Sequence, residues 1–444
     1  MRILSISELC AFCEGKLLGP QTERPVKHIV RDNREVEEDF CFAAIKGERL
    51  DGHDFCLDAA KRGASCCITE KLVPELGVPS ILVESVPEAL IKIATALRQE
   101  LSIPVVAVIG SSGKTTTKEM LYSVLSQKYK VLKNEGNYNN LLGVPLTIFR
   151  INPEHELAVL ELGISEFGEM SRLAQIAMPD YAVFTSVDRS HTDNLHDLNG
   201  VLKAKSELFN YMNSSSNVYL SFDDKLLRNL KLRQQSCFYG TADGADALAF
   251  NIGYKGAGGI EFNLKYKGRE LSLKSAEFGR HIVYAASAAA ALAIDLGLSD
   301  DEIIRGVLSY KPVGSRARLY DSMGFTLIDD AYNANPESLI LSLKSMTDLD
   351  GRKIAVLGDM YGLGEDAPSM HEECVDVALG LGIEVMSCGH RFPKGKTLHY
   401  ESKEALKIAL SKKIQKGDCV LVKASHASGF EEISSFLKEL DLKA

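Results

Sequence analysis

The stretch VVAVIGSSGKTTTKEM, from Val105 to Met120, constrains the fold of this chain more than any other. It opens with the apolar run VVAVI, which lacks polar alternation and therefore predicts a strand buried on both faces. A helical pattern begins at Thr115, with apolar residues at spacings of three and four. Between strand and helix lie four small residues that predict a tight loop: Gly110, Ser111, Ser112 and Gly113.

A loop that opens into a helix N-terminus gathers backbone N–H groups and a partial positive charge, which favours a bound phosphate. Lys114 would reach the outer phosphates of a nucleotide, and the hydroxyl of Thr115 could ligate a magnesium ion. The P-loop pattern is incomplete, because Val108 occupies the position of its first glycine. An ordinary βα turn with an exposed lysine is therefore the alternative. The place between strand and helix favours a nucleotide phosphate site made by seven residues: Gly110, Ser111, Ser112, Gly113, Lys114, Thr115 and Thr116.

Length and composition narrow the class of protein. A chain of 444 residues is long for one domain and predicts two or three. Its net charge of −9 argues against a nucleic-acid partner, because nucleic-acid-binding domains are usually basic. Glu8 interrupts the apolar N-terminal segment, which makes a poor signal peptide, and the most apolar helical stretch, Tyr284 to Leu298, is too short to span a bilayer. Ten cysteines without a completed zinc pattern indicate reduced thiols, so we expect a cytoplasmic protein that is not embedded in a membrane.

The secondary-structure pattern divides the chain into three blocks. Up to about Leu82 it is mixed, with short strand-like runs such as FCFAAI and ASCCITE. Strands and helices then alternate, which predicts a parallel sheet covered by helices on both faces, with a meander of strands at residues 247–278. From about Val313 the alternation resumes, with strands at TLIDDAYN, KIAVLGDM, IEVMSCG and CVLVKAS, and predicts a second doubly wound unit. Two such domains joined by a short segment form a cleft, where ligands usually bind.

Two polar side chains follow buried strands at the sheet edge that the phosphate loop also occupies. Glu161 ends the strand LAVLELG, and His191 follows the next strand, in TSVDRSHTD. Because the carboxyl ends of parallel strands share one edge, Glu161 could hold magnesium beside Thr115. A helix-capping or surface carboxylate is the alternative for Glu161, and a surface or packing residue is the alternative for His191.

Other polar groups are less specific. Lys205 lies in the helical VLKAKSELF, where lysines are usually solvated, and composition gives no reason to prefer it over Lys203. Further along, LIDDAYNANPESL places four polar residues at the end of a strand before a helix, and helix capping explains one or two of them. Their number suggests ligand contacts as well: Asp329, Asp330, Asn333 and Asn335.

The order of these motifs resembles the Mur ligase family. GSSGKTTTKEM is followed by NEGNYNNLLGVPLT, ELGISEFGEM, LIDDAYNANPES and VLGDMYGLGE, while IVRDNREVEEDFCFAAIKGERLDGHDF is similar to the family's uridine-nucleotide domain. The resemblance covers nearly the whole chain. It implies an α/β protein with three domains: a UDP-sugar-binding domain at 1–82, a central ATP-binding domain with a P-loop and a parallel sheet at 83–313, and a mobile, Rossmann-like doubly wound domain at 314–444.

The resemblance also implies an activity. It is that of an ATP-dependent amide-bond ligase, which joins D-alanyl-D-alanine to UDP-N-acetylmuramoyl-tripeptide through an acyl phosphate. This reaction is the last cytoplasmic step in making the peptidoglycan precursor. The implied cofactors are ATP and Mg²⁺, and the expected form is a monomer.

The resemblance assigns roles to individual residues. Lys114 and Thr115 match residues that serve phosphate and metal, Glu161 and His191 match magnesium ligands, and Lys205 matches a lysine that the family carbamylates into a metal-bridging group. Lys114, His191 and Lys205 are therefore the expected catalytic residues. The residues expected on the adenosine side are Arg316, Asp330 and Asn335. Those expected on the uridine side are Asp32, Asn33, Arg34, Lys46 and Gly47. Two further residues match a motif that faces the cleft: Lys423 and Ser425.

Several positions depart from the family pattern. Asn33 stands where the family usually has serine, Ala285 stands where an asparagine contacts adenine, and Thr192-Asp193 follows His191 in place of Leu-Glu. None of these changes removes a phosphate or metal ligand. Two alternatives remain: a superfamily member that adds another amino acid or acts on a folate, and a nucleotide-binding regulatory protein without turnover. The joint presence of Lys114, Glu161, His191 and Lys205 weighs against the second.

Overall fold

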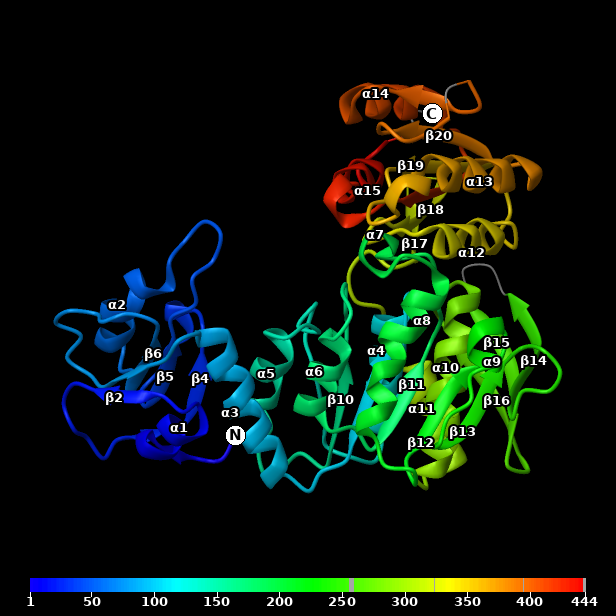
Figure 1. Cartoon of the computed structure of the whole chain (residues 1–444). Coiled ribbons are helices and arrows are strands. Elements are labelled where there is room, and N and C mark those ends of the chain that lie inside the picture. Colours follow the sequence, from blue (N-terminus) through cyan, green and yellow to red (C-terminus); the bar gives the residue numbers. More distant parts are fainter. Residues whose placement is uncertain (255–258, 323, 394, 442–444) are drawn as a thin grey trace.

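Three large β-sheets organise the part of the chain that the structure describes, and each is built from a different stretch of the sequence (Figure 1). The computed structural model describes residues 1–254, 259–322, 324–393 and 395–441. In Figure 1 the first sheet lies at the left, the second at the lower right, and the third above the second. Helix α3 (Val86–Glu100) lies between the first two sheets.

The N-terminal part folds around a five-stranded sheet, in which four strands run parallel and the outer strand β2 is antiparallel. In spatial order its strands are β2 (Lys16–Leu18), β7 (Ser80–Leu82), β6 (Cys66–Thr69), β5 (Phe40–Ala43) and β4 (His28–Val30). A small ladder and short helices complete this part: β1 (Leu4–Ser5), β3 (Pro25–Val26), α1 (Ile6–Phe12), η1 (Asn33–Glu35), η2 (Gly52–Phe55) and α2 (Cys56–Lys61).

The central part contains a nine-stranded sheet whose core is parallel. Strands β14, β15 and β16 form the antiparallel meander that the sequence predicts. In spatial order the strands are β16 (Arg269–Ser275), β15 (Ile260–Tyr266), β14 (Ala247–Tyr254), β13 (Gln235–Gly240), β12 (Asn217–Ser221), β11 (Tyr181–Phe184), β8 (Val105–Ile109), β10 (Leu157–Glu161) and β9 (Val131–Lys133).

Helices cover both faces of this sheet, which explains why β8 shows no polar alternation. Val105, Ala107 and Ile109 belong to the core on one face, and Val106 and Val108 belong to the core on the other. The first core includes residues of α3, α5 (Gly143–Ile148), α6 (Glu169–Ala177) and α8 (Leu198–Ser206). The second includes residues of α4 (Lys114–Leu125), α10 (Arg280–Asp295) and α11 (Asp300–Leu308). Short helices fill the connections: α7 (Thr192–Leu195), η3 (Glu207–Tyr211) and α9 (Lys225–Arg228).

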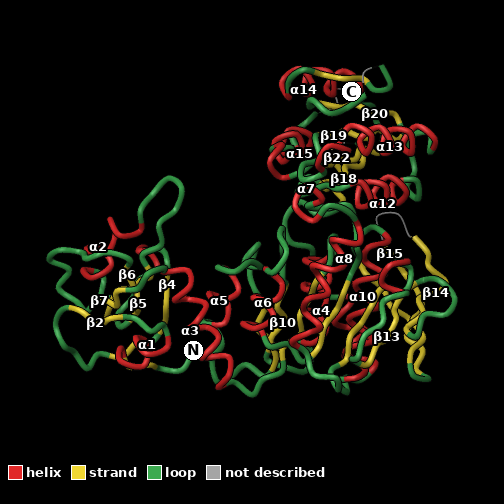
Figure 2. Tube along the Cα trace, viewed as in Figure 1, coloured by secondary structure: helices red, strands yellow, loops and turns green. Residues whose placement is uncertain are grey.

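The C-terminal part is a doubly wound unit with a six-stranded sheet, and Figure 2 shows its helices flanking the strands. The antiparallel edge strand β17 and the short β21 are additions that the sequence pattern did not predict. In spatial order the strands are β17 (Arg318–Ser322), β18 (Phe325–Asp330), β22 (Cys419–Lys423), β19 (Lys353–Gly358), β20 (Glu384–Cys388) and β21 (Leu398–Tyr400). The helical segments are α12 (Pro336–Met346), η5 (Gly364–Asp366), α13 (Ala367–Gly380), α14 (Lys403–Lys413), η6 (His426–Ser428) and α15 (Glu431–Lys438).

The predicted fold class is confirmed: the protein is an α/β protein with a parallel central sheet and a doubly wound C-terminal unit. Helices α12 and α13 cover one face of the last sheet, and α14 and α15 cover the other. Within the described ranges, no helix is both long and apolar enough to cross a membrane.

Candidate active site

The loop after β8 connects this strand to α4, as the sequence predicts. Gly110 has a positive φ of 143°, and a Cβ atom built on it would lie 2.0 Å from Oγ1 of Thr185. Only glycine fits this close approach, because any side chain would clash with the neighbouring strand end. Gly113, the N-cap of α4, also has a positive φ, of 77°. The two glycines that the sequence singles out are therefore required by the backbone path.

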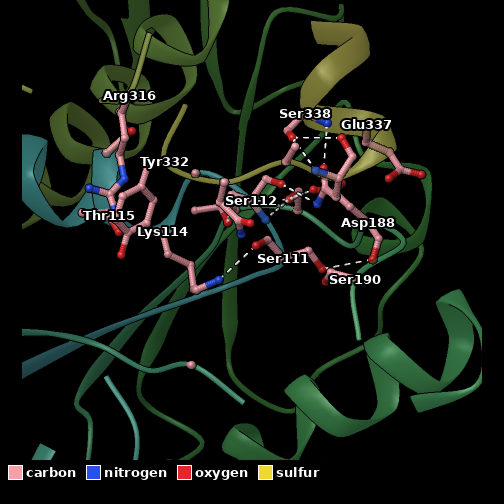
Figure 3. Close-up of a pocket in the computed structure, with 18 of the residues that line it drawn as sticks. Ser111, Ser112, Lys114, Thr115, Asp188, Ser190, Arg316, Tyr332, Glu337 and Ser338 are labelled. Carbon is pink, nitrogen blue, oxygen red and sulfur yellow. Dashed lines mark hydrogen bonds between the residues drawn. The ribbon is translucent and has the colours of Figure 1, made fainter. Parts of the chain in front are cut away.

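Lys114 folds back over this loop. Its Nζ donates hydrogen bonds to the carbonyl oxygens of Gly110, at 2.8 Å, and Ser111, at 3.0 Å, and Figure 3 shows it beside Ser111. Loss of water around the ammonium lowers the pKa of Lys114. The side chain is thus a half-buried cation whose hydrogen-bond acceptors in the described chain are neutral.

Glu161 ends β10 next to the phosphate loop and is 3% exposed. Its Oε2 accepts a hydrogen bond from the Thr115 hydroxyl at 2.9 Å, and its Oε1 accepts one from Nδ2 of Asn139 at 2.9 Å. The ammonium of Lys118 lies 3.7 Å from Oε2. Glu161 is therefore neither a surface carboxylate nor a helix cap, and it lies beside Thr115 as expected from the shared sheet edge.

The segment NEGNYNN holds Glu161 in place, a role that sequence reasoning missed. Oδ1 of Asn134 accepts the backbone N–H of Glu161 at 2.9 Å, and its Nδ2 donates to the carbonyl of Glu161 at 2.9 Å. Asn139 adds the side-chain contact described above. Tyr138 accepts a hydrogen bond from Arg31 at 3.1 Å, which links this loop to the N-terminal part of the chain. The hydrogen bonds of Asn134 and Asn139 to Glu161 join residues far apart in the sequence. The density of asparagines in NEGNYNN was therefore the only sign in the sequence that this segment has a structural role.

His191 and Lys205 lie near enough for the charge of Lys205 to act on His191, but the two residues differ in exposure. His191 is exposed and has a left-handed backbone conformation, with φ 55°, as the N-cap of the single-turn helix α7. Lys205 is 2% exposed, whereas Lys203 is exposed. Desolvation, followed by the charge of Lys114, lowers the pKa of Lys205 well below its usual value. No hydrogen bond or ion pair of Lys205 occurs within the described residues.

Asp188 is a further site residue that sequence reasoning missed. It is buried between the phosphate loop and His191, and its Oδ2 accepts a hydrogen bond from Ser186 at 2.8 Å. Desolvation raises the pKa of Asp188 to about 6. A single aspartate after a strand gives no sequence signal that separates it from a turn residue.

The C-terminal part supplies the opposite wall. The guanidinium of Arg316 lies 3.6 Å from the ring centroid of Tyr332, a cation–π contact. Asp330 accepts hydrogen bonds from the backbone of Ala317 at 3.1 Å and from Lys423 at 2.6 Å. Asn335 caps α12, which confirms that capping explains one of the four polar residues. Asp329 differs from the others, because it is buried among α15 residues, where Ser434 and Lys438 donate to it.

Asn335 also joins the two walls. Its Nδ2 donates to the hydroxyl of Ser112 in the phosphate loop at 2.9 Å. Ser425 is buried close by and donates to the carbonyl of Ala334 at 3.3 Å.

His281, in the first turn of α10, lines the cavity on the central side. Burial lowers the pKa of His281 to about 4, so its imidazole is neutral at pH 7.

These walls enclose a cavity of about 1040 Å³. Figure 3 shows Arg316 and Tyr332 at one end of this space and Asp188 and Glu337 at the other. Ala285 lines it at the position where the family has its asparagine. The predicted residues that line it are Ser111, Ser112, Gly113, Lys114, Thr115, Thr116, Glu161, His191, Arg316, Asp330, Asn333, Asn335, Lys423 and Ser425. Gly110 and Lys205 adjoin this region without lining the cavity.

The predicted uridine-side residues lie apart from the cavity, in the N-terminal part. Asn33 donates to Asp58 at 2.7 Å, and Arg34 pairs with Asp32 at 2.6 Å. The backbones of Lys46 and Asp51 form an isolated antiparallel β-bridge, and the backbone N–H of Gly47 donates to the carbonyl oxygen of Leu50 at 2.9 Å. They form a separate group on one domain.

The edge of the central sheet near Glu161 offers few side chains that could ligate a metal ion. Across the described ranges, no three His, Cys, Asp or Glu side chains gather closely enough to hold a metal ion by themselves. A magnesium ion commonly uses one or two protein carboxylates and takes its other ligands from water and substrate phosphates. Glu161 beside Thr115 meets that smaller requirement.

Comparison with known proteins covers the whole chain. The description "Mur ligase family, catalytic domain" matches residues 25–98, "Mur ligase middle domain" matches 108–293, and "Mur ligase, glutamate ligase domain" matches 315–426. The UDP-N-acetylmuramoyl-tripeptide--D-alanyl-D-alanine ligase of Bacillus subtilis is 34% identical over 99% of this chain and 99% of the relative. A MurF crystal structure from Acinetobacter baumannii has a TM-score of 0.89 at 26% identity and covers 99% of both chains. The MurF ligase of Thermotoga maritima, solved in complex with ADP, has a TM-score of 0.83 at 30% identity over 93% of this chain and 97% of that one.

Proposed function

Because this chain belongs to the Mur ligase family, we propose that it performs the reaction named for its full-length relatives. It is an ATP-dependent ligase that joins D-alanyl-D-alanine to UDP-N-acetylmuramoyl-tripeptide, the last cytoplasmic step in making the peptidoglycan precursor. The observation that carries this function is the cavity of about 1040 Å³ between the central and C-terminal parts, which is lined by the phosphate loop on one side and by Arg316 and Asp330 on the other.

The phosphate loop is proposed to bind the triphosphate of ATP. Backbone N–H groups at the start of α4 and the ammonium of Lys114 point positive charge at one place. The carbonyl contacts of Lys114 leave its charge uncompensated, so the γ-phosphate would be a stronger partner. Arg316, Asp330 and Asn335 are proposed to hold the adenosine side. Because Asp330 already accepts several hydrogen bonds, its orientation toward a ribose is fixed before binding.

The same edge fits a magnesium ion. Thr115 and Glu161 present a hydroxyl and a buried carboxylate in contact with each other, which are oxygen ligands of the kind that magnesium prefers. We propose that Thr115, Glu161, His191 and Lys205 hold it, the last as a carbamate. When bound, magnesium neutralises charge on the phosphate oxygens.

Lys205 is proposed to be carbamylated. Its burial and lack of a partner in the described chain oppose a charged ammonium, so the neutral amine is favoured. A neutral amine nitrogen can form a bond to the carbon of carbon dioxide and lose a proton, which gives an anionic carbamate. Lys203 on the same helix is exposed, so this argument from burial does not apply to it.

The chemistry proceeds by activating a carboxylate. The terminal carboxylate of the tripeptide is a poor electrophile, so transfer of the γ-phosphoryl group first converts it into an acyl phosphate and releases ADP. The neutral amine of D-alanyl-D-alanine then attacks the carbonyl carbon, the attacking nitrogen loses one proton to phosphate or solvent, and the tetrahedral intermediate expels phosphate. Charge develops on the phosphoryl oxygens during transfer, where Lys114 would stabilise it. Closure of the C-terminal part over the cavity would keep water from the acyl phosphate.

We propose domain boundaries at residues 1–82, 83–313 and 314–444. The first boundary is supported by β7, which ends at Leu82, and by α3, which packs against α5 and α6 of the central part. The N-terminal domain is proposed to bind the UDP end of the substrate through Asn33, Arg34, Lys46 and Gly47. We further propose that the enzyme acts in the cytoplasm as a monomer.

One endpoint assay tests this function. The purified chain is incubated with ATP, UDP-N-acetylmuramoyl-tripeptide and D-alanyl-D-alanine, and the product is identified by mass spectrometry. We expect UDP-N-acetylmuramoyl-pentapeptide, with phosphate release that requires both the tripeptide and the dipeptide. Product formation with a single amino acid but not with the dipeptide would assign the chain to a different reaction of the same family.

A further inference from the structure

One arginine connects the central sheet to two helices of the C-terminal domain. Arg189 follows β11, and its Nε donates to Oε1 of Glu337 at 2.6 Å, while its backbone N–H donates to Oε2 of the same carboxylate at 3.1 Å. Its Nη1 donates to Oε2 of Glu373 at 2.8 Å. Glu337 lies in the first turn of α12, and Glu373 lies on α13. Both the main chain and the side chain of Arg189 are therefore engaged.

One of the two carboxylates that this arginine holds, that of Glu337, lines the cavity. Glu337 lies two residues after Asn335, which donates to Ser112 in the phosphate loop, and Figure 3 shows Glu337 on the side of the cavity where Asp188 lies. On the central side, Arg189 directly follows Asp188 and precedes His191 by two residues. Fixing Glu337 to Arg189 thus fixes the start of α12 against the phosphate loop.

We propose that Arg189 is a positioning residue that holds the C-terminal domain over the phosphate loop through its ion pairs with Glu337 and Glu373. The proposal rests on the function proposed above, because only that function makes the alignment of the two walls matter. Arg189 itself need not touch ATP or either peptide. It acts by keeping Asn335, and with it the adenosine side of the cavity, at a set place relative to Ser112 and Lys114.

The exposure of the ion pairs suits a contact that can open. The side chains of Arg189, Glu337 and Glu373 are 24%, 32% and 46% exposed. An isolated exposed pair contributes little, but here the guanidinium is held by two carboxylates, and one of them also accepts the backbone N–H of Arg189, which gives a network with fixed geometry. Because the network is open to solvent, dissolved salt should weaken it. The contact is therefore strong enough to bias the domains and weak enough to release product.

The test replaces Arg189 with glutamine in the full chain. For Arg189→Gln we expect the KM for ATP to rise by roughly three- to tenfold with a smaller change in kcat, because the nucleotide must then align the domains itself. Small-angle scattering of the unliganded variant should give a larger radius of gyration than the wild type. Arg189→Lys should recover part of the loss, because it keeps the charge but not the two-pronged geometry.

Salt and a second variant separate this role from general destabilisation. Between about 0.05 M and about 0.5 M NaCl the KM of the wild type should rise toward that of Arg189→Gln, while the variant changes little. The combined variant Arg189→Gln/Glu337→Gln should lose less than the product of the two single losses. Arg269→Gln serves as the matched control. It also removes one positive charge, but Arg269 pairs with Asp300 inside the central domain.

The outcomes are distinct. A wild-type KM and an unchanged radius of gyration for Arg189→Gln would overturn the positioning role while leaving the ligase function intact. Equal losses for Arg189→Gln and Arg269→Gln would also overturn it, because the effect would then follow charge alone. A wild-type enzyme without dipeptide-dependent phosphate release would instead refute the proposed function, and the scattering comparison would still report on the ion pairs.

Discussion

Replacing Lys114 with alanine should abolish ligation and leave the fold intact. In the structure, Lys114 donates to two neutral carbonyl oxygens at 2.8 and 3.0 Å. Each hydrogen bond of this kind contributes about 1 kcal/mol to stability. Desolvation of the ammonium, which lowers the pKa of Lys114, opposes this gain. The free energy of unfolding should therefore change by less than the about 2 kcal/mol that two such hydrogen bonds would contribute by themselves.

The catalytic loss should be far larger. During phosphoryl transfer, the ammonium would face oxygens on which negative charge develops, and loss of one such stabilising group costs at least about a hundredfold in rate. The measurements are dipeptide-dependent phosphate release and a thermal melt of the unliganded protein. Lys128→Ala is the matched control, because Lys128 also donates to a backbone carbonyl, that of Gly297 at 2.8 Å, but on an exposed surface of the same domain. Near wild-type turnover of Lys114→Ala would refute the assignment of the phosphate loop.

Three further predictions follow from the same site. Lys205→Ala should lose most activity and regain part of it with added short carboxylates, whereas Lys203→Ala should keep the wild-type rate; full activity of Lys205→Ala without any additive would exclude a carbamate. ATP and the tripeptide together should reduce the radius of gyration measured by small-angle scattering, and identical dimensions with and without them would contradict domain closure. Burial lowers the pKa of His281 from 6.5 to about 4, so the unfolded chain binds more protons between these values and stability falls as pH drops from 6.5 toward 4. His281→Gln should reduce this acid-side loss of stability by up to about 3 kcal/mol, which would be seen as a smaller fall of the thermal midpoint between pH 6.5 and 4. An unchanged dependence of the midpoint on pH would contradict it.

Local patterns predicted those parts of the fold that local physics determines. The run Val105 to Ile109 lacks alternation because cores lie on both faces of β8, and the glycines that follow it are required by positive φ angles. The meander and the doubly wound C-terminal unit also follow from period and alternation. The spatial order of strands was not predictable, because it depends on pairing between segments far apart in the chain. The edge strand β17, for example, is defined only by its partner β18.

The same limit applies to the site. Glu161 was predictable because its strand end shares an edge with the phosphate loop, which is a rule of parallel sheets. The asparagines that hold Glu161, and Arg189 with its two carboxylates, act across long sequence separations, so nothing near them in the sequence identifies a partner. Such contacts become visible only when the domains are placed together.

For Lys205, the sequence does contain a signal that distinguishes it from Lys203. In α8 and the turn that follows it, Val201, Ala204, Lys205 and Leu208 are buried, which is the spacing of an apolar helical stripe. A lysine inside such a stripe contradicts the local pattern, and conflicts of this kind concentrate at functional sites. The rule alone is insufficient, however, because Lys118 in α4 is buried too. Lys118 donates to the carbonyl of Asn134 at 2.8 Å and lies 3.2 Å from Glu119, so its charge is compensated. The two lysines differ in their partners rather than in their burial: Lys118 has acceptors for its ammonium, whereas Lys205 has none within the described residues, which favours its neutral amine.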